Sequence, residues 1–302
     1  MTTDVSAVIA RIPLWAAAAN VQVTPLGGGI TNQNYRVDVE GEAFVLRISG
    51  ANTDLLGIDR QVEHAASQAA AAAGIAPDVV YFLEPEGYLV TRFIEGRPLP
   101  EETLRQPETL ARVVAALQAF HRLPAIPGSF SAFRVVETYA ATAREYGVPF
   151  PPDFDWLLER KQEIERALAA QPFTPRPCHN DLLNGNFLDD GAIRILDWEY
   201  AGMGDVFFDL ANLAINHSFA EEDDRRLLQA YFGGVSPGAW ARLRLMKMMS
   251  DFREAMWGVM QQGISQLEFD FRDYADKHFR RMAGNMRDPG WHSWLQEASH
   301  GV

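Results

Sequence analysis

Cysteine is almost absent from this chain of 302 residues, because Cys178 is the only one. One cysteine excludes an intramolecular disulfide and a cysteine-based metal site, and it suits the reducing environment of the cytosol. Cys178 follows Pro177, and a free cysteine of this kind is usually a small buried side chain rather than a nucleophile. We therefore expect a cytoplasmic protein that uses neither disulfides nor a reactive thiol.

Long apolar runs and basic charge are also scarce. The longest weakly polar stretch, residues 65–76, is interrupted by Ser67, Gln68 and Gly74. No charged segment followed by an apolar one opens the sequence, so we expect neither secretion nor a membrane span. The 27 basic residues are outnumbered by 40 acidic ones, which gives a formal net charge of -13. This charge disfavours nucleic acid as a partner and favours a small cationic molecule.

The spacing of apolar residues differs between the first third of the chain and the rest. Alternating apolar and polar residues predict strands within residues 21–49 and at 79–83 and 88–93, with a helix at 59–73 between them. An opening helix is expected at residues 3–20. After the turn-rich segment IEGRPLPEE, helices are expected from Pro107 and at 135–146, 154–170, 207–219, 225–232, 239–263 and 271–286.

These patterns predict an α+β fold with two lobes. The small N-terminal lobe, residues 1–95, would hold an antiparallel sheet and a helix. The larger C-terminal lobe, residues 96–302, would be mainly helical. The hydrophobic content of 47% and the charged content of 22% are typical of a globular protein throughout.

The segment CHNDLLNGNFLDDGAIRILDWE, residues 178–199, places acids and amides around two short apolar runs. Asp190 and Gly191 are typical of a two-residue hairpin turn. Pairing of the flanking residues 189 and 192 would set Asn186 opposite Ile195. Asp197 would then lie just beyond, at the same open end of the hairpin.

Asn186 and Asp197 in this arrangement offer the oxygen ligands that Mg²⁺ prefers. Asp181, five residues before Asn186, can reach the same place as a general base that orients a hydroxyl group. His179 is expected to organise the loop rather than to transfer protons. Taken singly, each residue could simply cap a turn around a buried hairpin. Their joint spacing matches the HxDxxxxN catalytic loop and the later metal-binding Asp of kinases.

A nucleotide also needs a cradle for its phosphates, and the segment GGGITNQN between two predicted strands offers one. The backbone amides of Gly27, Gly28 and Gly29 can face phosphate oxygens, and the small polar residues Thr31 and Asn32 follow them. Without further context, such a segment is equally typical of a flexible turn.

Arg47 lies on a predicted strand where protein kinases carry a phosphate-binding lysine. Arginine can bind phosphate with two parallel hydrogen bonds, so the exchange is chemically sensible. Glu63 in the following helix is the expected partner of Arg47, although a glutamate on a helix is commonly solvated surface. Residues 93–96 would form the hinge that contacts adenine through its backbone.

The segments FVLRISG, HNDLLNGN and LDWEYAGMGDVFFDLAN follow one another in an order that resembles the choline/ethanolamine kinases. These belong to the wider group of aminoglycoside-phosphotransferase-like small-molecule kinases. The resemblance covers nearly the whole chain and implies a protein-kinase-like fold of two lobes. It also implies that ATP and magnesium are used to phosphorylate the hydroxyl group of a small cationic amino alcohol. Asp209 would brace the catalytic loop without touching substrate.

A later segment, FREAMWGVMQQGISQLEFDFRDYADKHFRRM, is similar to the one with which choline kinases build their choline pocket. The resemblance implies that Trp257, Phe269 and Tyr274 enclose the quaternary ammonium group, which aromatic faces attract. Two departures leave fewer rings around the ammonium group: Met260 stands where the family has a further Trp, and an aromatic residue expected around Met203 is missing. Aromatic residues at such positions are also routine in helix packing.

Glu199, two residues after Asp197, is the candidate for a carboxylate beside the ammonium group. Choline is the acceptor that the resemblance favours. Ethanolamine needs the same carboxylate but fewer aromatic walls, and an aminoglycoside would also suit an acidic chain. A protein of another class, an inactive module that binds a nucleotide or a cation, stays open as well. A homo-oligomer is compatible with the sequence but is not derivable from it.

Overall fold

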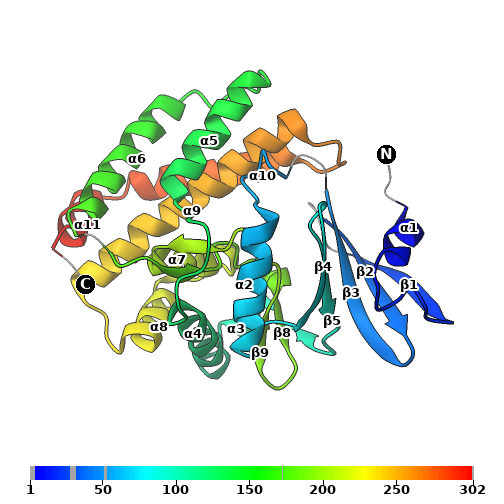
Figure 1. Ribbon diagram of the computed structural model, residues 1–302. Helices are drawn as coiled ribbons and strands as arrows, with labels where there is room; N and C mark the ends of the chain where they lie inside the picture. The colour runs from blue at the N-terminus through cyan, green and yellow to red at the C-terminus, as the bar shows by residue number, and fades with distance from the viewer. Residues whose placement is uncertain (1–3, 28–31, 51–52, 172, 301–302) are drawn as a thin grey trace.

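Sheet and helix occupy different parts of the chain, as the periodicity predicts (Figure 1). The computed structural model describes residues 4–27, 32–50, 53–171 and 173–300. An antiparallel sheet with the strand order β1-β2-β3-β5-β4 lies in the N-terminal part, and helices make up most of the C-terminal part. The expected α+β class is therefore confirmed.

The expected ranges agree with most of the observed elements. The strands of the large sheet are β1 (Val21–Leu26), β2 (Asn32–Val39), β3 (Glu42–Ser49), β4 (Val79–Leu83) and β5 (Tyr88–Arg92). The shorter strands are β6 (Arg97–Pro98), β7 (Arg176–Cys178), β8 (Phe187–Asp189), β9 (Ile193–Ile195) and β10 (Gly202–Gly204). The helices are α1 (Val5–Ala10), α2 (Arg60–Ala72), α3 (Glu101–Leu104), α4 (Pro107–His121), α5 (Ala132–Glu145), α6 (Phe154–Ala169), α7 (Val206–Asn216), α8 (Glu221–Phe232), α9 (Pro237–Ile264), α10 (Phe271–Met286) and α11 (Trp291–Ala298).

One face of the large sheet is covered by α1 and the segment that follows it. The alternate residues Phe44, Leu46 and Ile48 of β3 are buried on this face, and the ring of Trp15 lies 5.6 Å from that of Phe44. Because successive side chains of a strand point to opposite faces, Arg47 is directed to the other face. That face is turned toward the helical part of the molecule.

The opening helix is much shorter than expected, since α1 ends at Ala10 and residues 11–17 form turns. Pro13 explains the difference. Proline has no N–H to donate and disfavours helical backbone at the residue before it, here Ile12. The predicted helix at residues 3–20 was therefore wrong in its extent.

Helix α2 begins and ends where its flanking residues predict. The side chain of Asp59 accepts hydrogen bonds from the N–H groups of Gln61 and Val62, at 2.9 and 3.2 Å, and so caps the first turn. Gly74 follows the helix with φ of +73°, a conformation that glycine adopts without strain. Both signals are local, which is why the sequence placed this helix correctly.

Buried apolar residues form two clusters. One joins the sheet to α1, and the other contains Ala66 and Ala70 of α2 together with the helical part. Figure 1 accordingly shows α2 lying between the sheet and the helices of the C-terminal part. The division of the chain into lobes at residue 95 stays a prediction.

Helix α9 runs through the middle of the helical part and contacts α5, α7, α10 and α11 (Figure 1). Its residues are buried on nearly all sides. Helix α9 nevertheless carries buried charges at Lys247, Asp251, Arg253 and Glu254. Within the described residues, no helix is long and apolar enough to cross a membrane.

The hairpin around residue 190 has a register that differs by one residue from the expected one. Phe187 pairs with Ile195 and Asp189 with Ile193, so the loop holds three residues rather than two. Gly191 has φ of +104°, and the N–H of Gly191 donates to the Asp189 side chain at 2.9 Å. This side-chain bond favours the wider loop, and it moves Asn186 from its predicted place opposite Ile195.

Candidate active site

The candidate catalytic loop, residues 178–186, is held by one buried carboxylate. The N–H groups of His179 and Asn180 donate to Asp209, at 2.8 and 2.6 Å. Asn180 has φ of +67° and uses its side-chain amide to donate to the carbonyl of Tyr200, at 3.0 Å. The side chain of Asn212 accepts the N–H of Leu182 at 2.6 Å. Because Asp209 and Asn212 lie on α7, that helix determines the shape of the loop.

The contacts of His179 fit the organising role that the sequence predicts. Its Nε2 lies 2.9 Å from the carbonyl of Leu196, and its Nδ1 accepts the N–H of Asp181 at 3.2 Å. The proton of a neutral ring must then be on Nε2. Burial lowers the pKa of His179, which keeps the ring neutral near pH 7.

Asp181 is buried and forms an ion pair with Arg253 of α9. Oδ1 of Asp181 lies 3.0 Å from Nη1 of Arg253. Burial raises the pKa of Asp181 to about 7, although Arg253 acts to lower it. A carboxylate that titrates near neutral pH is well suited to accept a proton from a hydroxyl group.

The same guanidinium group connects Asp181 to a second buried acid. Nη1 of Arg253 lies 2.7 Å from Oε1 of Glu254, and the hydroxyl group of Tyr274 donates to Oε2 of Glu254 at 2.7 Å. Burial acts to raise the pKa of Glu254, but Arg253 and His278 bring it below its ordinary value. Three successive contacts thus run from the catalytic loop to the aromatic residues of α10.

Asn186 and Asp197 lie at the same end of the hairpin, as their spacing predicts. The N–H of Leu196 donates to the carbonyl of Asn186 at 2.8 Å, which brings Asn186 beside the residue before Asp197. The side-chain amide of Asn186 donates to the carbonyl of Asp181, at 2.9 Å, and leaves its oxygen as a ligand atom. The side chain of Asp197 is 33% exposed, so an ion can reach it. This oxygen donor set fits magnesium.

Arg47 of β3 forms the expected ion pair with Glu63 of α2. Around this pair, the carboxylates of Glu63, Asp197 and Glu199 contact the guanidinium groups of Arg47 and Arg60. Among the described residues, Nε and Nη2 of Arg47 are buried without a hydrogen-bond partner. Buried donors of this kind need an acceptor, and the excess of carboxylates favours a cation. Both observations fit a phosphate group bound together with a divalent ion.

Of the glycine-rich segment, Gly27 directly follows β1. A Cβ atom added at Gly27 would meet nothing within 4 Å. Gly28, Gly29 and Thr31 lie outside the described residues. The phosphate-binding role of these residues stays a prediction.

Trp257, Phe269 and Tyr274 lie together, in a cluster of rings that also contains Phe271. The ring of Tyr274 lies 5.5 Å from that of Trp257 and 6.0 Å from that of Phe269. Phe269 is 43% exposed, so the cluster is open to solvent on that side. Met260 is fully buried, which places it in the core around α9 rather than on an accessible wall.

Glu199 contacts residues of the N-terminal part. Its carboxylate pairs with Arg60, at 3.1 Å, and accepts a hydrogen bond from Asn32, at 2.9 Å. The side chain of Asn32, predicted to bind the nucleotide, is therefore engaged with Glu199. Glu254 is the carboxylate that contacts Tyr274. The role of Glu199 beside an ammonium group stays a prediction.

Sequence reasoning missed Arg253 and Glu254 as candidate site residues. A signal was present, because both are charged and occur inside the predicted helix 239–263, which is largely apolar. Charged side chains are almost never fully buried unless they are paired. Their partners, Asp181 and Tyr274, are 72 and 20 residues away in the chain. No spacing rule could therefore name the pairs.

Comparison with known proteins gives consistent matches over most of the chain. Residues 22–246 match the phosphotransferase enzyme family. The chain is 27% identical over 300 residues to probable choline kinase 1 of Arabidopsis thaliana, with 86% of each chain covered. It is 26% identical over 292 residues to ethanolamine kinase 2 of Rattus norvegicus, covering 84% of this chain and 73% of that protein. The crystal structure of a choline/ethanolamine kinase family protein from Mesorhizobium loti superposes with a TM-score of 0.85 at 32% identity, covering 98% of both chains.

Proposed function

Because the chain belongs to the phosphotransferase enzyme family and is a choline/ethanolamine kinase-like enzyme acting on an alcohol group, we propose that it transfers the terminal phosphoryl group of ATP to choline. The observation that carries the proposal is the path of contacts from Asp181 through Arg253 and Glu254 to Tyr274. This path connects a candidate base to a cluster of aromatic rings. A cationic alcohol bound at the rings would therefore have its hydroxyl group near a carboxylate.

Arg47 holds the phosphates of the nucleotide in this proposal. Its side chain is fixed by Glu63 and lies 3.3 Å from Asp197. The guanidinium donors that have no partner among the described residues are then available for phosphate oxygens. A guanidinium group can bind phosphate with two parallel hydrogen bonds, so Arg47 would orient the phosphates as well as attract them.

Asn186 and Asp197 are the residues that would hold magnesium. When bound there, the ion would neutralise charge on the phosphate oxygens. The hydrogen bond that the side-chain amide of Asn186 donates to the carbonyl of Asp181 keeps the ligand oxygen of Asn186 beside the candidate base.

Asp181 orients the hydroxyl group of the acceptor and accepts its proton. The new oxygen–phosphorus bond forms as the bond from the terminal phosphorus to the bridging oxygen breaks and ADP leaves. Arg253 fixes the Asp181 side chain through its 3.0 Å contact. Asp209 fixes the backbone on the other side of the loop through His179 and Asn180. Positioning and charge neutralisation are the main means of catalysis in phosphoryl transfer, and these contacts supply the positioning.

The ring cluster supports choline as the acceptor. A quaternary ammonium group has no N–H to donate, and aromatic faces are its best partners. Ethanolamine is the second candidate, and the position of Glu254 beside the ring of Tyr274 favours it. A carboxylate next to Tyr274 can accept hydrogen bonds from a primary ammonium group, which choline cannot donate.

An ADP-release assay with ATP and MgCl2 tests the proposal against choline, ethanolamine, their N-methylated intermediates and kanamycin. We expect the highest kcat/KM with choline, and no turnover after removal of divalent ions with EDTA. A preference for ethanolamine would replace choline by the second candidate. Turnover of kanamycin alone would contradict an amino-alcohol acceptor. Nucleotide binding without turnover of any acceptor would indicate an inactive binding module.

Replacing Phe269 with alanine tests the role of the rings separately. We expect the KM for choline to rise about 2- to 30-fold, which corresponds to the loss of one cation–π contact of about 0.5–2 kcal/mol, with the KM for ATP unchanged. Leu267→Ala is the matched control, because Leu267 is 53% exposed in the same connection between α9 and α10. An equal rise of KM in both variants would contradict a specific role of the Phe269 ring.

A further inference from the structure

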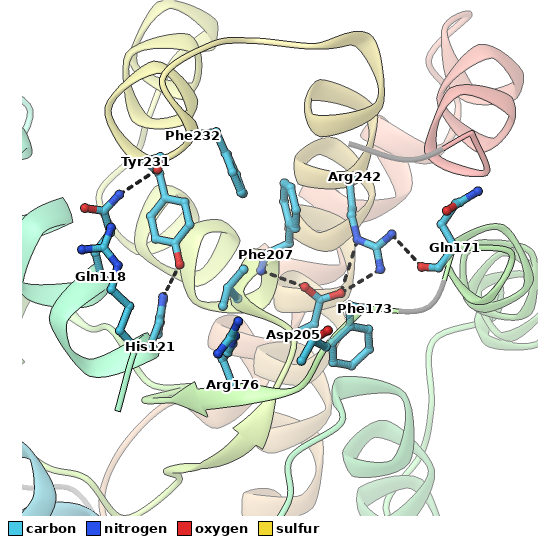
Figure 2. A pocket seen from close by; sticks show the side chains of 13 residues that line it. Gln118, His121, Gln171, Phe173, Arg176, Asp205, Phe207, Tyr231, Phe232 and Arg242 are labelled. Atoms are coloured by element: carbon cyan, nitrogen blue, oxygen red, sulfur yellow. Dashed lines mark hydrogen bonds and ion pairs between the residues drawn. The ribbon is translucent and has the colours of Figure 1, made fainter. Parts of the chain in front are cut away.

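A cavity of about 440 Å³ lies between α4, β7, α7, α8 and α9, and none of its lining residues belongs to the candidate active site. Figure 2 shows it, with Tyr231 and Phe232 of α8 on one side and Arg176 of β7 on another. Its volume is within the range of small-molecule binding sites. The cavity is therefore large enough for a ligand of its own.

The charge of this cavity is opposite to that of the chain. Three guanidinium groups, of Arg122, Arg176 and Arg242, line it, against the one carboxylate of Asp205. Arg242 is buried and compensated, since its Nη2 lies 3.0 Å from Asp205. Within the described part of the chain, Arg122 and Arg176 have no ion-pair partner. A protein with a net charge of -13 thus keeps two uncompensated cations at one cavity.

Both of these cations line the same cavity as Tyr231. Burial raises the pKa of Tyr231, while Arg122 and Arg176 act in the opposite direction. Two guanidinium groups that line one cavity suit a doubly charged anion, because each can donate two parallel hydrogen bonds to phosphate oxygens. A phosphate monoester has this charge near neutral pH.

Part of the cavity wall is apolar. The rings of Phe207 and Phe232 are stacked, with centroids 5.0 Å apart and planes inclined by 20°. Phe232 is 39% exposed, so its ring is accessible to a second flat group. The cavity therefore suits a ligand with a planar apolar part as well as a phosphate group.

Two side chains connect the cavity to the catalytic loop. The hydroxyl group of Tyr231 lies 2.6 Å from Nδ1 of His121, and Nε2 of His121 lies 2.9 Å from Asp209 (Figure 2 shows the first contact). Asp209 accepts the N–H groups of His179 and Asn180. Ordering of Tyr231 by a ligand would therefore restrict the carboxylate that fixes the loop.

We propose that this cavity is an effector site for a small organic phosphate with a flat apolar group, and that its occupancy stabilises the catalytic loop through Tyr231, His121 and Asp209. The phosphate binds Arg122 and Arg176, and the flat group packs on Phe232. The proposal is independent of which acceptor the enzyme phosphorylates.

Calorimetric titration of the full chain with phenyl phosphate tests the binding. We expect saturable binding. Inorganic phosphate and phenol should each bind about tenfold more weakly or worse, because the first lacks the flat apolar group and the second lacks the phosphate. The double variant Arg122→Gln, Arg176→Gln should lose about tenfold or more in affinity. Arg280→Gln, at an exposed arginine of α10, is the control and should bind normally. Unchanged binding by the double variant would place the anion elsewhere, such as at Arg47, and overturn the proposal.

Hydrogen exchange measures the effect on the loop without any turnover. We expect phenyl phosphate to slow exchange of the backbone N–H groups of His179 and Asn180, because these donate to Asp209. The slowing should disappear in the double variant and in Tyr231→Phe, which removes only the hydroxyl group that meets His121. Binding that leaves this exchange unchanged would overturn the effector role. Since neither measurement needs phosphoryl transfer, failure here is distinguishable from failure of the proposed kinase reaction.

Discussion

Replacing Asp181 with asparagine is expected to lower kcat about 10²- to 10⁴-fold, the usual contribution of a positioned general base. Asparagine keeps the size of the side chain but cannot accept the proton of the acceptor hydroxyl group. The KM for ATP should change little, because Arg47, Asn186 and Asp197 are untouched. The measurement is steady-state kinetics with choline, together with calorimetric binding of the magnesium–ATP complex to confirm that the nucleotide still binds.

The matched control for this prediction is Asp190→Asn. Asp190 lies in the nearby hairpin loop, where it pairs with Arg194 at the surface, and a surface change of this kind leaves stability within about 0.5 kcal/mol. Its kcat should equal that of the unmodified enzyme. Full turnover by Asp181→Asn would remove the base role and leave Asp181 as a structural partner of Arg253.

Replacing Arg253 with methionine is expected to lower the free energy of unfolding by about 3–5 kcal/mol, because one partner of a buried ion pair is removed. Arg253 is 2% exposed and contacts both Asp181 and Glu254. Its loss leaves two buried carboxylates without their common cation. Urea denaturation measures the stability. The kcat for choline should fall as well, because Asp181 loses the contact that orients it.

A second substitution distinguishes this electrostatic cause from simple loss of packing. In the double variant Arg253→Met, Glu254→Gln, one of the two stranded charges is gone. We expect it to recover about 0.5–3 kcal/mol relative to the single variant, the range of coupling between residues in contact. Arg280→Met, at an exposed arginine, should be close to neutral. A double variant no more stable than Arg253→Met would show that the unpaired charge of Glu254 is not the cause of the lost stability.

Features that depend on neighbouring residues were predictable from the sequence. Helix α2 is delimited by Asp59 and Gly74, and the buried face of β3 follows from strict alternation. The family was also predictable, because its motifs are short and ordered, and the matches over residues 22–246 confirm it. The two wrong element predictions have local causes as well. Pro13 ends the opening helix early, and the Asp189 side chain favours a three-residue loop instead of a two-residue turn.

Pairs distant in the chain were decided by the tertiary structure. Arg253 meets Asp181 because α9 packs against α7, whose Asp209 and Asn212 hold the catalytic loop. The contacts of Glu199 and Glu254 are also distant in the chain: Arg60 and Asn32 engage Glu199, while α10 brings Tyr274 to Glu254.

The sequence by itself determined the fold class, the family and the candidate residues Asp181, Asn186, Asp197 and Arg47, because short-range spacing and local backbone preferences specify each of them. The tertiary structure decided which charge neutralises which. Ion pairing depends on distance in space and on burial, which residue spacing does not encode. The cavity beside Tyr231 arises in the same way, since α4 and β7 meet the later helices α7, α8 and α9 there.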